Sequence, residues 1–113
     1  MSNEFQKASK FRFTSEVDYS EGGIVSKNVL KQANGNISLF AFDKGEGLST
    51  HTAPFDAMVQ VLEGKARVVI DGKSHDLEAG ETIIMPANLP HSVEATEQFK
   101  MLLTMIKEIF KIP

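Results

Sequence analysis

The sequence predicts one all-β domain with the short-strand pattern of a sandwich or barrel. Short runs of apolar and β-branched residues alternate with turn-forming residues along the chain. Apolar residues make up 42% of the sequence, an ordinary share for a globular protein. At 113 residues the chain is long enough for one domain with its own core and too short for two. We therefore expect a single domain over residues 1–113, with residues 1–23 as an N-terminal arm.

The strands are expected between clusters of turn-forming residues, in the order of the chain. The predicted strands are residues 24–32, 37–42, 58–62, 65–70, 73–77, 82–85, 91–95 and 99–106. Residues 99–106 also tolerate a short helix, but a closing strand continues the preceding rhythm better. Helix is expected for residues 108–111 or for part of the arm.

Three turns are predicted from residue pairs that contain glycine. Asn34-Gly35 and Asp71-Gly72 are typical of two-residue hairpins, because both members tolerate positive φ. Gly64 follows a glutamate and predicts a further turn between strands 58–62 and 65–70.

Composition narrows the classes of function. The net charge is −3 and the basic residues are scattered, whereas a nucleic-acid-binding protein normally carries a basic stripe. The chain has no cysteine, so disulfides, thiolate ligands and thiol nucleophiles are all excluded. No apolar run is long enough to span a bilayer, and residues 1–10 lack the apolar stretch of a signal peptide. We expect a cytoplasmic protein that binds neither nucleic acid nor membrane.

Two motifs with regular spacing occupy the central part of the chain. The first, residues 45–64, begins and ends with glycine and contains His51. The second, residues 80–95, begins with Gly80 and contains Pro86 and His91. With fifteen residues between them, this pair resembles the two motifs of the cupin superfamily, in its small single-domain conserved-barrel (cupin 2) type. The resemblance implies a double-stranded β-helix, or jelly-roll, barrel.

The same resemblance implies a metal site that this chain retains in part. Cupins bind a divalent transition metal through two histidines and a glutamate of the first motif and a histidine of the second. His51 and His91 match two of these positions, while Ala53 and Ala57 occupy the other two. Asn88 stands where the family has glycine, and asparagine tolerates positive φ better than most residues.

His51 and His91 are therefore the candidate ligands for nickel, zinc, iron or copper. Two imidazoles are fewer than the three protein ligands that catalytic zinc sites usually have. Without a metal, the two rings could act as general acid and base, or hydrogen-bond a ligand carboxylate. The residues expected to line the pocket are Ala53, Ala57, Val59, Met85 and Met101.

Three functions remain open on this basis, and catalytic residues are not assigned. The preferred one is binding of a small, partly apolar molecule, because the two alanines remove charge and add space. The second is a metal-dependent enzyme of the oxygenase or isomerase type. The third is a structural or regulatory module without a ligand.

A homodimer is also expected. The arm contains three apolar aromatic residues, Phe5, Phe11 and Phe13. These side chains could cover the sheet of their own barrel or that of a partner chain. Strand alternation turns a second set of residues away from the pocket and into this contact. That set is Met58, Gln60 and Leu62.

Overall fold

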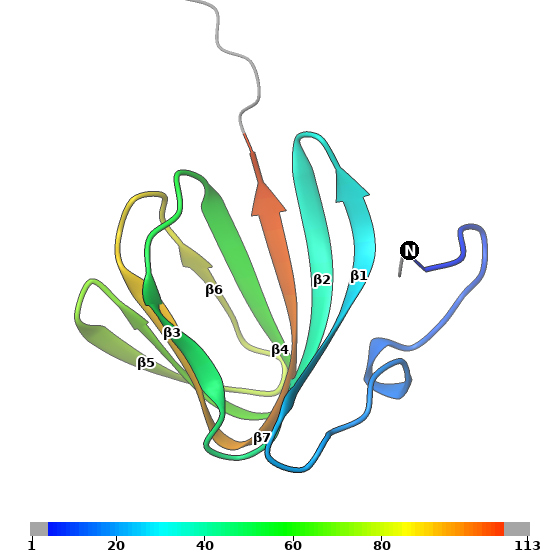
Figure 1. The fold of residues 1–113 in the computed structure, drawn as a ribbon, viewed down its shortest axis with the longest axis horizontal. Coiled ribbons are helices and arrows are strands. Elements are labelled where there is room, and N and C mark those ends of the chain that lie inside the picture. Colours follow the sequence, from blue (N-terminus) through cyan, green and yellow to red (C-terminus); the bar gives the residue numbers. More distant parts are fainter. Residues whose placement is uncertain (1–4, 108–113) are drawn as a thin grey trace, which may run out of the picture.

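The computed structural model describes residues 5–107 as a seven-stranded antiparallel barrel preceded by an arm (Figure 1). This confirms the predicted all-β jelly-roll fold. The elements are a single 3-10 turn η1 (Phe13–Ser15) and the strands β1 (Ile24–Gln32), β2 (Gly35–Phe42), β3 (Gly47–His51), β4 (Asp56–Ile70), β5 (Lys73–Glu78), β6 (Thr82–Met85) and β7 (His91–Ile106).

The long strands β4 and β7 run through both halves of the barrel. The first part of β4 pairs with β6 and with the end of β7, and the end of β7 also pairs with β2. The second part of β4 pairs with β5 and with the beginning of β7, to which β3 adds. Two curved sheets therefore share their central strands and enclose one interior, as Figure 1 shows.

The predicted turn at Gly64 is wrong, because β4 continues through it. Gly64 has φ +81°, and the pairing with β7 changes register on either side of it. A Cβ atom at this position would lie 1.8 Å from the carbonyl oxygen of Gln98. Glycine thus allows β4 and β7 to bend past each other at a bulge instead of ending the strand.

A similar merger occurs in β7, which joins the predicted strands 91–95 and 99–106. The helical alternative for residues 99–106 is excluded. The helix considered for residues 108–111 lies outside the described residues.

Both predicted two-residue hairpins are present, but only one has the predicted residues at its turn. Asp71 and Gly72 have φ values of 49° and 81°, which confirms the predicted turn between β4 and β5. The predicted hairpin between β1 and β2 is also present, but its turn lies at residues 33–34, and Gly35 begins β2 without a positive φ. A Cβ at Gly35 would lie 2.7 Å from the carbonyl oxygen of Met105. Close approach of β7, not turn geometry, explains the glycine.

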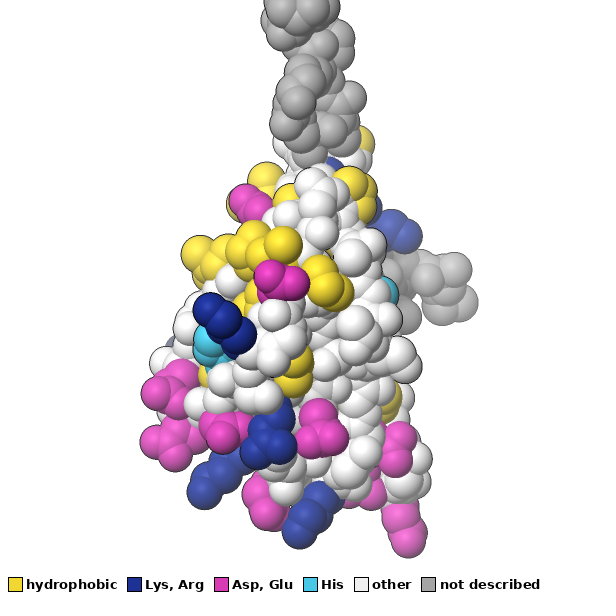
Figure 2. Space-filling model, turned by 90° about the vertical axis from the view of Figure 1, so that its left-hand side faces the viewer, with side chains coloured by type: hydrophobic (Ala, Val, Ile, Leu, Met, Phe, Trp, Pro, Cys, Tyr) yellow, Lys and Arg dark blue, Asp and Glu magenta, His cyan; other side chains and the backbone are white. Residues whose placement is uncertain are grey.

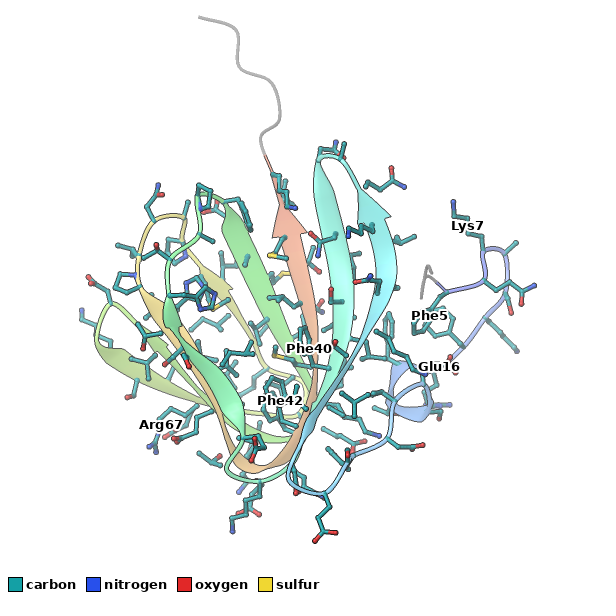
Figure 3. The ribbon with its side chains drawn as sticks, viewed as in Figure 1. Phe5, Lys7, Glu16, Phe40, Phe42 and Arg67 are labelled. Carbon is teal, nitrogen blue, oxygen red and sulfur yellow. The ribbon has the colours of Figure 1, made fainter. Side chains whose placement is uncertain are left out.

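One hydrophobic cluster fills the barrel interior. The rings of Phe42 and Phe99 are fully buried and stack there, with centroids 4.6 Å apart and planes at 8°. Phe40 extends the stack from Phe42 at 5.7 Å, and Figure 3 shows both side chains in the lower part of the barrel. The buried members are Phe42, Ala57, Val59, Val61, Ala66, Val68, Leu77, Met85, Val93, Ala95, Phe99 and Met101.

A second cluster lies on the outer face of β1, β2 and β7, beneath the arm. The arm contributes Val17, with Phe5, Phe13 and Tyr19 packed around it, and Figure 3 shows Phe5 on the outer side of β1. Phe5 and Phe13 thus cover the barrel's own sheet, while Phe11 packs against these two rings and stays 43% exposed. The remaining buried members are Val29, Leu39, Ala41 and Leu102.

A buried lysine fastens the arm to the barrel. Lys100 projects outward from β7 and its Nζ donates a hydrogen bond to the Thr14 carbonyl oxygen at 2.7 Å. The same ammonium lies 3.6 Å from a Glu63 carboxylate oxygen and 5.0 Å from the centre of the Tyr19 ring. The Tyr19 hydroxyl donates to that carboxylate at 2.6 Å. Burial, and then the hydrogen bond and charge of Glu63, raise the pKa of Tyr19.

Over residues 5–107, no helix is long and apolar enough to cross a membrane.

Candidate functional site

The two histidines singled out in the sequence meet at one end of the barrel. His51 is the last residue of β3 and His91 the first of β7, and the two are direct partners across these strands. Their Nε2 atoms are 3.1 Å apart, and the ring centroids are 4.4 Å apart with the planes at 70°. Strand pairing, which brings together residues forty positions apart, therefore builds the pair.

Backbone carbonyl groups fix the orientation of both rings. Nδ1 of His51 lies 2.8 Å from the carbonyl oxygen of Ser49, and Nδ1 of His91 lies 3.1 Å from that of Leu89. A carbonyl oxygen only accepts hydrogen bonds, so each Nδ1 carries the hydrogen. Each Nε2 of a neutral ring is then left with a lone pair directed at the other histidine.

The histidines differ in their exposure to solvent. His91 is 5% exposed and belongs to the barrel interior, whereas His51 is exposed at the rim. The loop between β6 and β7 adjoins them. Asn88 has φ +68° in this loop, as its replacement of a glycine predicted, and its N–H donates to the Ala53 carbonyl oxygen at 2.7 Å. This bond ties the segment after His51 to the segment before His91.

A small, mostly apolar cavity adjoins the pair. Its volume is about 50 Å³, enough for a few water molecules and well below the about 300–1,000 Å³ typical of pockets for organic ligands. The pocket is thus apolar, as the alanines predicted, but large neighbouring side chains occupy most of the space they free. The lining residues are Leu48, His51, Ala53, Phe55, Ala57, Met85, His91, Val93, Met101, Leu103 and Met105.

Four of the five residues expected to line the pocket do so. Ala53 lines it although β3 has already ended at His51. Val59 lies deeper, fully buried in the interior cluster, and does not border the cavity. Sequence reasoning missed five lining residues, which are Leu48, Phe55, Val93, Leu103 and Met105. Met105 shares its inward direction with Met101, four positions earlier in β7, so strand alternation could have identified it.

Other side chains do not complete a metal site around the pair. Among the described residues, no group of three or more histidine, aspartate or glutamate side chains is placed to share an ion. Gln60 pairs with Leu102 and Thr82 on the neighbouring strands and is not among the residues that line the cavity. His75 lies exposed on β5.

Residues 38–107 match the family model of the cupin domain, well over half of the chain. The chain belongs to the cupin family. Among curated proteins none matches it. Its antiparallel barrel is therefore a cupin barrel.

Solved structures of similar proteins agree with this assignment. A conserved protein of unknown function from Streptococcus pyogenes is 34% identical, with a TM-score of 0.90 over 96% of both chains. A cupin 2 conserved barrel domain protein from Leptotrichia buccalis is 46% identical, with a TM-score of 0.83; 86% of this cupin aligns with 47% of that chain. A cupin superfamily protein from Desulfitobacterium hafniense is 25% identical, with a TM-score of 0.86 over 95% of this chain and 97% of the other.

Proposed function

We propose that His51 and His91 hold a divalent transition-metal ion at the rim of the barrel, and that a small anionic molecule binds there. The observation that carries this proposal is the 3.1 Å separation of the two Nε2 atoms. Nickel, zinc, iron and copper are the candidate ions.

Electrostatics favours a cation at this position. Two neutral imidazoles with their hydrogens on Nδ1 direct lone pairs at each other, which is repulsive at 3.1 Å. A cation within reach of both nitrogens converts that repulsion into two attractive contacts. Metal–imidazole bonds of about 2.0–2.1 Å allow two ligand nitrogens of one ion to lie this far apart. The hydrogen bonds from Nδ1 to the Ser49 and Leu89 carbonyls are those that metal-binding histidines usually make.

The surroundings of the pair define the molecule that would bind. When bound, a metal ion supplies a Lewis acid that attracts oxygen anions and lowers the pKa of a coordinated water. Two neutral imidazoles leave the ion its full charge, which favours carboxylates and enolates. The adjoining cavity of about 50 Å³ accepts an apolar group of only a few heavy atoms. The proposed ligand is therefore a small carboxylate or enolate with its polar end at the rim.

A second candidate is binding of the same class of molecule without a metal. A proton shared between the Nε2 atoms would also remove the lone-pair repulsion and would give the pair one positive charge. The apolar cavity beside the histidines supports this alternative, because it suits an organic ligand with or without a metal.

Metal binding by histidine variants separates these candidates. We expect the wild type, dialysed against zinc or nickel, to retain close to one ion per chain by elemental mass spectrometry. His51→Ala and His91→Ala should each lose at least about nine-tenths of it, because one imidazole remains. His75→Ala is the matched control, since His75 is exposed on β5 away from the cavity, and it should retain the wild-type amount. Folded wild-type protein without metal would contradict the metal proposal and favour the shared proton.

We also propose that the chain forms a homodimer through an exposed apolar face. Ile84 on β6 is 61% exposed, and it pairs with the half-buried Met58 of β4. Figure 2 shows hydrophobic side chains gathered over the upper part of the side that carries β3, β5 and β6. Light scattering should give twice the chain mass for the wild type and the chain mass for Ile84→Lys. A monomeric wild type would contradict the dimer.

A further inference from the structure

Two methionine side chains flank the smallest side chain in this part of the cavity lining, that of Ala57. Ala57 on β4 has Met85 of β6 as its partner on one side and Met105 of β7 on the other. Side chains directly opposite each other in an antiparallel sheet have Cβ atoms about 4.5–5.5 Å apart. The three residues thus form one row across the sheet, Met85–Ala57–Met105, and all three line the cavity that contains both histidines.

The donor atoms of this cavity are consequently nitrogen and sulfur. Among the described lining residues, the side chains other than the two histidines offer only the thioether sulfurs of methionine as donors. Ala57 leaves free volume between Met85 and Met105, and methionine has three rotatable bonds with which to occupy it. Met101, four positions earlier in β7, adds a third thioether to the cavity lining.

This donor set discriminates between metals. Thioether ligands favour Cu(I), and imidazole suits copper as well as zinc, iron and nickel, whereas magnesium, calcium and manganese favour carboxylate, carbonyl and water oxygens. Burial acts in the same direction, because a monovalent ion costs less to remove from water than a divalent one. Met85 is 3% exposed and His91 5% exposed, so an ion between them would lie in largely apolar surroundings.

We propose that the cavity selects Cu(I), with the imidazoles of His51 and His91 and the thioethers of Met85 and Met105 as its ligands. This inference rests on the proposed metal-binding role of the histidine pair and departs from it in one respect, because the preferred ion is monovalent copper and not one of the divalent candidates. The methionines thereby have a role in metal selection besides filling the core.

The test is a competition for Cu(I) between the protein and the chelator bicinchoninate under anaerobic conditions. Leucine conserves most of the volume of methionine and removes its sulfur. We expect Met85→Leu and Met105→Leu each to lower Cu(I) affinity by about tenfold or more, the range found for altered metal surroundings. Zinc affinity should stay within about threefold of the wild type, since zinc depends on the imidazoles. Met58→Leu is the matched control on β4 and should change neither affinity, because Met58 does not line the cavity.

Copper X-ray absorption supplies a readout that does not depend on affinity. We expect copper–sulfur scattering in the spectrum of the Cu(I)-loaded wild type. It should be lost in the variant that carries both Met85→Leu and Met105→Leu. Should Met85→Leu fail to fold, Met105→Leu decides, because Met105 is only half-buried.

Two different failures can be told apart. Zinc binding through the histidines, with Cu(I) affinity unchanged in both methionine variants and no sulfur scattering, overturns the selectivity and leaves the histidine site intact. A wild type that binds neither zinc nor Cu(I) overturns both.

Discussion

The inner and outer faces of β7 are both covered by apolar side chains, but they are held together in different ways. Along β7, Phe99 and Met101 point into the barrel, while Lys100 and Leu102 point out beneath the arm. The inner face is closed by the barrel's own strands. The outer face is closed by a separate segment, the arm, through apolar contacts and the hydrogen bond from Lys100 to the Thr14 carbonyl.

This difference separates the candidate site from the arm. Strand register places His51 beside His91 and Ala57 between two methionines, and none of these residues contacts the outer cluster. The arm can therefore loosen without disturbing the histidine pair, whereas a defect in the interior cluster should affect both faces. Substitutions on each face can test this asymmetry.

The largest expected effect comes from the interior. Phe99→Ala removes one ring of the Phe42–Phe99 stack from a fully buried position and should destabilise the protein by about 3–5 kcal/mol. Urea unfolding measures this change, and both faces should lose structure in a single transition. Phe11→Ala is the control: that ring belongs to the arm and is 43% exposed, so its loss should cost about 1 kcal/mol or less. Equal effects of the two substitutions would contradict the asymmetry.

Much of this interior could be predicted from the sequence. The alternation of apolar residues predicted which side chains of each strand point inward, and the Asp71-Gly72 pair predicted a hairpin. Local conformational preference suffices in both cases. The turn roles predicted for Gly64 and Gly35 were wrong for a common reason. Each glycine is required by a distant segment of β7, and a local pattern does not reveal that contact.

The candidate site shows the same limit. Motif spacing identified His51 and His91, but the 3.1 Å contact between their Nε2 atoms depends on the pairing of β3 with β7. The size of the cavity could also not be predicted from the sequence. Replacement by Ala53 and Ala57 suggested open space, yet side-chain packing from other strands leaves only about 50 Å³.

An intermediate effect is expected at the fastening of the arm. Lys100→Met keeps the aliphatic stem but removes the ammonium, its hydrogen bond to Thr14 and its contact with Glu63. Loss of such a charged hydrogen bond at a side chain only 7% exposed should cost about 1.5–3 kcal/mol in urea unfolding. Trypsin should also cut the arm faster, while the metal binding proposed for the histidine pair stays unchanged.

The control for this substitution is Lys44→Met. Lys44 and Glu97 form an exposed ion pair at 3.6 Å, and such pairs contribute little to stability. Unaltered cleavage of the arm in Lys100→Met would show that the apolar contacts alone hold it.

The smallest effect is expected where the arm passes into β1. Asp43 accepts hydrogen bonds from the N–H groups of Gly22 and Lys44 and from the side-chain amide of Gln98. These bonds, led by that of Gly22, hold the pKa of the Asp43 carboxyl below its ordinary value of 3.8. Because the pKa is lower in the folded protein, the stabilisation is fully present above the unfolded value. It is lost as the pH falls through the folded value.

Urea midpoints measured from about pH 6 down to about pH 2.5 test this coupling. Other carboxylates titrate in the same window, so the informative quantity is the difference between the wild type and Asp43→Asn. We expect that difference to be small and constant near neutral pH and to shrink as the medium becomes acidic, since the wild-type carboxylate is then protonated too. Asparagine retains an acceptor oxygen but no charge, so a constant difference at every pH would assign the role of Asp43 to geometry alone. A shrinking one would show that its charge joins the arm, through Gly22, to β7, through Gln98.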